Sequence, residues 1–262
     1  MNTLYKLINN LIKQTTTILK LITNKFHCNT TKTPKHIFII LITIFSALNI
    51  NIANADTNNS KSLSNLNASG SITIKEGVDY TLLNNLTVPV TQNQNSSKVE
   101  VKEFFSFTCI HCKELEPLVE TSLLKHQSIN FNKIHVVWDD SSASLGRLNA
   151  TLQELKLNNL YIPFFTAVFA QQDISNLNSI TKILQTNHFN KQQIDNFVNV
   201  YNSFSINAKV NEYKEFTKNY NIMATPTFIV GDYYVVKPAT PDRLIKVVLE
   251  LVKKYQTLKT TK

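Results

Sequence analysis

The feature that most constrains this chain is the Cys-Ile-His-Cys run at 109–112, which lies between an apolar segment and a helical one. The apolar residues 99–107 predict a buried strand, and residues 113–125 have the spacing of a helix. Two thiols three residues apart at a helix start can form a small disulfide, and the partial positive charge of the helix N-terminus stabilises a thiolate there. The run therefore predicts a redox-active cysteine pair.

The two cysteines are expected to have different roles. Cys109, nearer the helix start, is predicted to be the exposed nucleophile, and Cys112 the more buried thiol that resolves a mixed disulfide. His111 lies between them, and its protonated ring adds a positive charge that favours the thiolate. Because a stabilised thiolate favours the reduced protein, the pair is predicted to be an oxidant, and Lys113 adds a weaker effect of the same sign.

A Cys-x-x-Cys pair can also be half of a zinc site, which needs two further Cys or His ligands at suitable spacing. The chain offers no second pair of this kind: Cys28 lies in a segment expected to be removed, and His126, His135 and His188 stand singly. Redox chemistry is therefore favoured over metal binding and over a purely structural disulfide. No metal and no organic cofactor is predicted, because the cysteine pair itself carries the electrons.

A second signature is Pro226, which directly precedes the apolar residues 227–230. A proline cannot donate a ladder hydrogen bond, so it belongs at a strand start or a bulge. A cis Thr225–Pro226 bond fits this position, the alternative being a trans proline at a sheet edge. We expect Thr225 to offer a free backbone edge to an extended substrate segment, with Ile110 and His111 lining that surface.

Together these motifs resemble the thioredoxin superfamily, and within it the DsbA family of bacterial periplasmic thiol oxidases. The similarity covers residues 77–252 and includes the strand at 103–107 that leads into the cysteine pair, Pro117 five residues after it, and the Thr225–Pro226 loop. The resemblance implies an α/β protein with a thioredoxin fold, a central mixed β-sheet flanked by helices, and an inserted all-helical domain. It also implies a thiol:disulfide oxidoreductase whose partners are unfolded or partly folded exported proteins with free cysteines.

Glu103 is unusual because its neighbours form a buried strand, where ionisable residues are rare. One interpretation is an exposed carboxylate at a sheet edge. The other is a buried acid below the cysteine pair, paired with Lys133 on the next apolar segment and able to relay a proton when Cys112 ionises. DsbA-like proteins resemble this second arrangement at both positions.

The chain departs from the family at Ile110, where DsbA proteins commonly have proline. The two central residues of the motif tune thiol stability in this superfamily. Because His111 is retained, an oxidase is favoured over the alternatives. Those alternatives are a disulfide reductase or isomerase and, in another class, a non-catalytic client-binding protein or metallochaperone. The resemblance further implies reoxidation by a membrane quinone-linked partner of the DsbB type.

The first 55 residues have the pattern of a secretory signal peptide with a long n-region. An apolar run at 37–48 follows Lys35 and His36 and precedes the Ala-Asn-Ala site at 53–55. The run is shorter than the roughly 20 residues that span a bilayer. We therefore expect export to the periplasm and cleavage after Ala55, an uncleaved N-terminal anchor being the alternative. The long n-region is explained either by a misplaced start codon or by a true extension.

The net charge of the chain does not indicate a nucleic-acid-binding protein. The chain carries a formal net charge of +9, but residues 1–55 hold six lysines and no acidic residue, so residues 56–262 carry 21 basic and 18 acidic side chains. The basic character belongs largely to the targeting segment, and no nucleic-acid partner is predicted.

The remaining segments divide by composition and periodicity. Residues 56–71 are rich in Asn and Ser and predict a flexible leader, whereas leucine and phenylalanine recur at helical spacing from 142 to 220. We therefore expect a first thioredoxin-fold part at 72–141, the inserted helical domain at 142–220 and a second part at 221–256. The predicted strands are 80–83, 99–107, 131–137, 227–230 and 233–236, and the predicted closing helix is 242–254.

Overall fold

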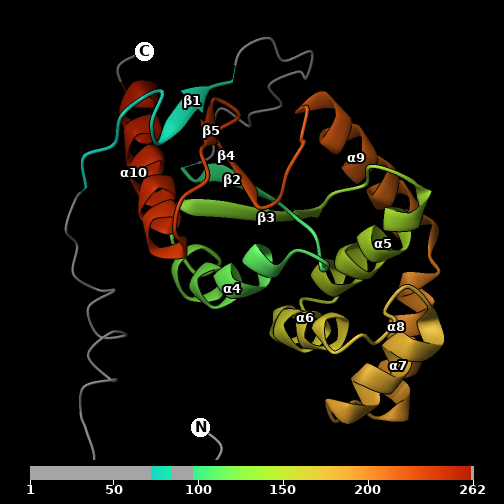
Figure 1. Ribbon diagram of the computed structural model, residues 1–262. Helices are drawn as coiled ribbons and strands as arrows, with labels where there is room; N and C mark the ends of the chain where they lie inside the picture. Colours follow the sequence, from blue (N-terminus) through green and yellow to red (C-terminus); the bar gives the residue numbers. More distant parts are fainter. Residues whose placement is uncertain (1–71, 84–96, 261–262) are drawn as a thin grey trace, which may run out of the picture. The chain divides into compact units, whose positions relative to one another are not determined.

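A five-stranded sheet organises residues 72–83 and 97–260, the residues that this computed structural model describes (Figure 1). The predicted signal peptide and leader lie outside these residues. The strands are β1 (Tyr80–Leu82), β2 (Val99–Phe105), β3 (Ile129–His135), β4 (Thr227–Val230) and β5 (Tyr234–Val236), in the order β1-β5-β4-β2-β3. β2 and β3 are parallel and the other neighbours are antiparallel, so the sheet is mixed, as predicted.

β2 and β3 begin or end two residues away from their predicted positions, and β1 and β5 differ from prediction by one residue each. The prediction extended β2 to residue 107 and placed β3 at 131–137, but the ladder between them runs from the Val99–Ile129 pair to the Phe105–His135 pair. A strand continues only while its neighbour supplies hydrogen bonds. The apolar residues 136 and 137 are therefore buried beyond the end of the ladder, and apolar sequence alone overestimated both C-terminal ends.

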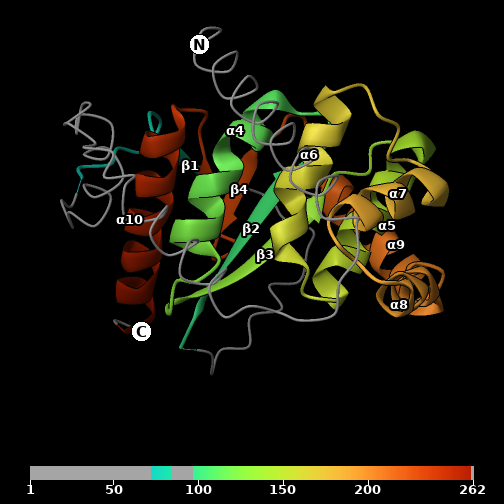
Figure 2. The same cartoon turned by 90° about the horizontal axis from the view of Figure 1, so that it is seen from below.

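Helices cover both faces of the sheet (Figures 1 and 2). They are α4 (Ile110–Leu118), the π-helical turn η2 (Val119–Leu123), α5 (Asp140–Glu154), the 3-10 turn η3 (Asn158–Leu160), α6 (Tyr161–Phe169), α7 (Leu177–Thr186), α8 (Lys191–Tyr201), α9 (Phe204–Asn219) and α10 (Pro241–Thr260). α4 and α10 pack on one face of the sheet, and α5 and α9 pack on the other. The inserted helices therefore share a core with the sheet.

The helix that starts beside the cysteine pair, α4, differs from the single helix predicted at 113–125. It begins three residues earlier, with Cys109 as its N-cap, and it changes to the π-helical turn η2 at Val119, two residues after Pro117. A proline removes one helical N–H and crowds the preceding turn, which favours a local change of helix type. At the C-terminal end of the described chain, α10 starts at Pro241, a residue suited to a first helical position, and it is longer than predicted.

A separate apolar cluster joins the inserted helices to the cysteine pair. Phe105, the last residue of β2, and Phe107, two residues after it, are fully buried and pack with Cys112 and with residues of α5 to α8. Phe107 stacks on Tyr161 of α6 with ring centroids 5.9 Å apart. These aromatic residues are thus core residues that support the site from below.

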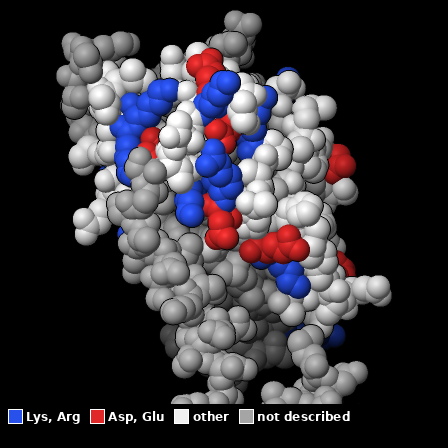
Figure 3. Space-filling model, turned by 60° about the vertical axis from the view of Figure 1, so that its left-hand side comes forward, with Lys and Arg blue, Asp and Glu red and all other residues white. Residues whose placement is uncertain are grey.

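The face that carries α10 shows basic and acidic side chains interspersed (Figure 3). Arg243 of α10 pairs with Asp79 at 2.7 Å, and Lys253 pairs with Glu250 at 2.9 Å. Within residues 72–83 and 97–260, none of the helices combines the length and apolar content that crossing a bilayer requires.

Gly231 provides a stability test of the turn between β4 and β5. Its φ is +64°, and a Cβ built there would lie 2.5 Å from the Tyr255 ring. Gly77 also has positive φ, +82°, but open space surrounds its Cβ position. We expect Gly231→Ala to lower the free energy of unfolding by about 2 kcal/mol or more, and Gly77→Ala by about 1 kcal/mol. Urea unfolding of both variants checks this order, and equal losses would contradict it.

Candidate active site

The two cysteines lie at the N-terminus of α4, where β2 has just ended. Cys109 is partly exposed, Cys112 is fully buried, and both thiols are free. The Cys112 backbone N–H donates to Cys109 Sγ at 3.3 Å, and the Cys109 thiol donates to the Thr225 carbonyl oxygen at 3.3 Å. Helix start and facing loop therefore both direct polar groups at the exposed sulfur.

These contacts separate the acidities of the two thiols. The hydrogen bond from the Cys112 side chain lowers the pKa of Cys109 to about 5, and the Thr225 side chain and the backbone N–H groups of His111 and Cys112 act in the same direction. Burial raises the pKa of Cys112, and the hydrogen bond to Cys109 and the nearby Glu103 add to this effect. At neutral pH the exposed sulfur is a thiolate and the buried one a thiol, the division of roles that a nucleophile and a resolving cysteine need.

The low pKa of Cys109 predicts a pH-dependent stability of the reduced protein. The folded value of about 5 lies below the ordinary value of 9.0, so the unfolded chain binds more protons between these pH values. The stabilisation is complete above about pH 9 and is lost as the pH falls through 5, whereas the oxidised protein has no thiol to titrate. We expect the urea midpoint of the reduced protein to rise, relative to the oxidised one, from pH 5 to pH 8. A pH-independent difference would rule this out.

The other side chains of the motif point outward. His111 is exposed, and its Nδ1 lies 3.3 Å from Glu114 Oε2 one turn later. Ile110 is 43% exposed. Lys113 lies over the Phe169 ring of α6, 5.0 Å from its centroid, so its ammonium is directed at α6. The contact between Glu114 and His111 was not predicted from the sequence.

The loop that faces the cysteines contains the Thr225–Pro226 peptide bond, which is cis, as predicted. Beside it lies a mainly apolar groove of about 250 Å³. The groove is lined by His111 and Leu115 of α4, by Ala224, Thr225, Pro226 and Thr227, and by Val236, Pro238, Ala239, Pro241 and Leu244. The structure thus brings the motif, the proline loop and the start of α10 around one cavity.

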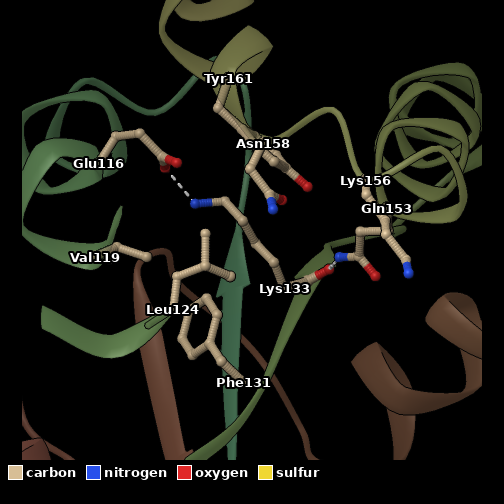
Figure 4. Close-up of a pocket in the computed structure, with 9 residues that line it drawn as sticks. All are labelled: Glu116, Val119, Leu124, Phe131, Lys133, Gln153, Lys156, Asn158 and Tyr161. Carbon is tan, nitrogen blue, oxygen red and sulfur yellow. Dashed lines mark hydrogen bonds and ion pairs between the residues drawn. The ribbon is translucent and has the colours of Figure 1, made fainter. Parts of the chain in front are cut away.

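Below Cys112, three ionisable side chains form a buried cluster. Lys133 Nζ donates to Glu103 Oε2 at 3.0 Å and also pairs with Glu116 of α4. The contact between Glu103 and Lys133 was predicted, and both side chains are at least 94% buried. Figure 4 shows Lys133 pointing toward Glu116 beside a cavity of about 210 Å³, which Tyr161 also lines.

Charges within the cluster shift the proton affinities. Burial raises the pKa of Glu103 to about 7, although Lys133 opposes the shift. Burial disfavours the charge of Lys133, but the two carboxylates outweigh it and raise the Lys133 pKa. Among the described residues, Glu103 Oε1 is the buried side-chain polar atom that lacks a hydrogen-bond partner. Glu103 is thus poised to bind or release a proton near neutral pH.

Glu116 was missed from the sequence, although a signal for it existed. It follows Cys112 by four residues, a spacing that places both side chains on one face of the helix. His135, interpreted as an isolated histidine, lies fully buried behind the site at the end of β3. The described residues contain no group of three or more His, Cys, Asp or Glu side chains arranged to hold a metal ion.

A cysteine pair at a helix N-terminus, facing a cis-proline loop on a mixed sheet, defines a thiol:disulfide oxidoreductase of the thioredoxin fold. The family model described as Thioredoxin matches residues 89–250. The thiol:disulfide interchange protein DsbA of Burkholderia cepacia is 31% identical over 148 residues, which are 55% of this chain and 68% of that protein. The chain belongs to the DsbA family.

Further comparisons agree with membership of the DsbA family. DsbA of Pseudomonas syringae pv. tomato is 27% identical over 199 residues, which are 74% of this chain and 90% of that protein. The crystal structure of reduced DsbA1 from Neisseria meningitidis superimposes with a TM-score of 0.63 at 26% identity, over 72% of this chain and 98% of that one. The fold, with its helical insertion, is therefore that of the DsbA oxidoreductases.

Proposed function

We propose that this protein donates a disulfide from the Cys109–Cys112 pair to exported substrate proteins during oxidative folding. The observation that carries the proposal is the environment of Cys109, whose sulfur accepts the Cys112 N–H and has a pKa of about 5. A thiolate of low basicity is a good leaving group and stabilises the reduced protein, so the disulfide is readily given up. The names of the relatives agree with disulfide interchange.

The reaction proceeds by two exchanges. A substrate thiolate attacks Cys109 Sγ, a mixed disulfide forms, and the Cys109–Cys112 bond breaks with Cys112 leaving as the thiolate. A second substrate thiolate then attacks the substrate sulfur of the mixed disulfide and releases Cys109 as a thiolate. The substrate loses two electrons, which the cysteine pair gains, and neither a metal nor an organic cofactor takes part.

Glu103 and Lys133 serve the departing Cys112 in this proposal. A buried thiolate is costly, and the raised pKa of Cys112 makes it take up a proton as it leaves. Glu103, with a pKa of about 7, supplies that proton, and the Lys133 ammonium compensates the negative charge that remains on Glu103. The cavity beside Lys133 offers a route for water to restore the proton.

Substrate binding is assigned to the groove beside Thr225 and Pro226. Unfolded proteins present apolar side chains, and the groove is mainly apolar. The protein's partners are unfolded or partly folded exported proteins with free cysteines. A DsbB-type quinone-linked membrane protein then restores the Cys109–Cys112 disulfide. The signal-like sequence of residues 1–55 supports export, and we infer that the protein acts in the periplasm.

The direction of exchange is tested by equilibrating the purified protein with graded glutathione buffers and trapping the free thiols. A disulfide donor stays reduced in mildly oxidising buffer and, when oxidised, forms disulfides in a reduced client protein. A pair whose disulfide resists reduction would instead indicate a reductase or a structural role. Client binding without any thiol exchange would indicate the non-catalytic alternative.

A further inference from the structure

His135, the last residue of β3, has both ring nitrogens engaged although its side chain is completely buried. Nδ1 lies 2.9 Å from the Val136 carbonyl oxygen, and Nε2 lies 3.2 Å from the Phe107 backbone nitrogen. A carbonyl only accepts and a backbone N–H only donates. The ring is therefore neutral with its proton on Nδ1, and Nε2 accepts the Phe107 N–H.

This contact occurs where β2 leaves the sheet. The last backbone bond between the two strands runs from the Val136 N–H to the Phe105 carbonyl, at 2.9 Å. Two residues later the Phe107 N–H has no strand partner, and a buried N–H without an acceptor is unfavourable. His135 Nε2 accepts the Phe107 N–H in place of a carbonyl oxygen from a neighbouring strand.

The ring is held firmly in this position. It stacks on Phe107 with centroids 5.6 Å apart and meets Phe105 edge-on at 5.3 Å. Burial lowers the pKa of His135 to about 4, which keeps the acceptor available at neutral pH. The ionisable groups that face this layer are Cys112, which packs with Phe105 and Phe107, and Tyr161, which stacks on Phe107 with ring centroids 5.9 Å apart. Lys133 lies 4.6 Å from the centroid of the Phe105 ring and pairs with Glu103 and Glu116.

The turn that His135 supports carries the nucleophile. Cys109 follows Phe107 by two residues, and its N–H donates to the Ser106 carbonyl at 3.0 Å. We propose that His135 is a positioning residue for Cys109: by accepting the Phe107 N–H, it fixes the turn that aligns the Cys109 sulfur with the N–H groups of α4. The inference rests on the proposed thiol–disulfide exchange and assigns to it a residue that does not touch the reacting sulfurs.

Two amide variants that differ by one methylene provide the test. In His135→Gln the side-chain oxygen reaches the position of Nε2 and can accept the Phe107 N–H, whereas the shorter side chain of His135→Asn cannot. The readouts, in the full chain, are the pH profile of Cys109 alkylation and the equilibrium with glutathione. We expect His135→Asn to lower the alkylation rate at pH 6 and shift the glutathione equilibrium, each by about threefold or more, and His135→Gln to restore most of both.

A third variant and urea unfolding separate positioning from stability. His135→Leu removes both hydrogen bonds and is expected to resemble His135→Asn; where it fails to fold, the comparison of Asn with Gln decides. If the Asn variant unfolds at lower urea but keeps the Cys109 pH profile and the glutathione equilibrium, the positioning role is refuted. Failure of the wild-type protein to exchange disulfides would count against the proposed function instead, and the alkylation profile would still test His135.

Discussion

Replacing Cys109 with serine is expected to abolish disulfide donation, whereas replacing Cys112 with serine should turn the protein into a trap for its substrates. The Cys112→Ser variant keeps the reactive thiolate, which forms mixed disulfides that no internal thiol resolves. The Cys109→Ser variant keeps a thiol that is fully buried and held protonated. Because only an accessible thiolate reacts, its alkylation should be at least about 100-fold slower than that of Cys112→Ser.

The experiment compares covalent adducts with an oxidised client on non-reducing gels, together with alkylation rates at pH 7. Adducts should accumulate with Cys112→Ser and be absent with Cys109→Ser. A double variant that lacks both cysteines is the matched control for non-covalent binding. Undiminished activity of Cys109→Ser would favour the client-binding alternative, since no thiol exchange could then account for the activity.

Removal of Lys133 should have the largest effect on stability. Lys133→Met leaves Glu103 and Glu116 buried without their common cation, and breaking such a buried pair costs about 3–5 kcal/mol. The loss should be smaller at pH 5 than at pH 8, because Glu103, with a pKa of about 7, is protonated and uncharged at pH 5. Fluorescence of Trp138, the single tryptophan of the chain, reports unfolding in urea at both pH values.

Glu103→Gln changes a residue of the same cluster and is expected to shift the free energy of unfolding in the opposite direction from Lys133→Met. The folded pKa of Glu103, about 7, lies above its ordinary value of 4.5, so the folded state holds a proton that the unfolded chain releases. This carboxylate therefore costs stability as the pH rises from about 4.5 to 7. The Gln variant should gain stability relative to wild type across that window and have no advantage below it. A loss that grows with pH would show that ionised Glu103 stabilises the fold through Lys133.

Local sequence patterns were sufficient wherever the chemistry depends on neighbours along the chain. The cysteine spacing predicted a helix start with Cys109 at its edge and Cys112 inside, because three residues bring a side chain back by almost one turn. The proline before an apolar run predicted the strand start and the cis bond. The contact between Glu103 and Lys133 could also be inferred, since each is a charged residue within a buried strand, and such residues need partners.

The sequence by itself therefore determined the redox pair and the proline loop, and its resemblance to the DsbA family implied the mixed sheet. Only the tertiary structure decided where β2 and β3 end, that Glu116 completes the charge cluster, and that His135 accepts the Phe107 N–H. In each case the deciding contact comes from another helix or strand. Hydrophobic periodicity indicates which face of a helix or strand is buried, but it does not identify the residues that this face contacts. Strand ends and buried polar partners are fixed by hydrogen bonds between elements, and those exist only once the helices and the sheet have packed together.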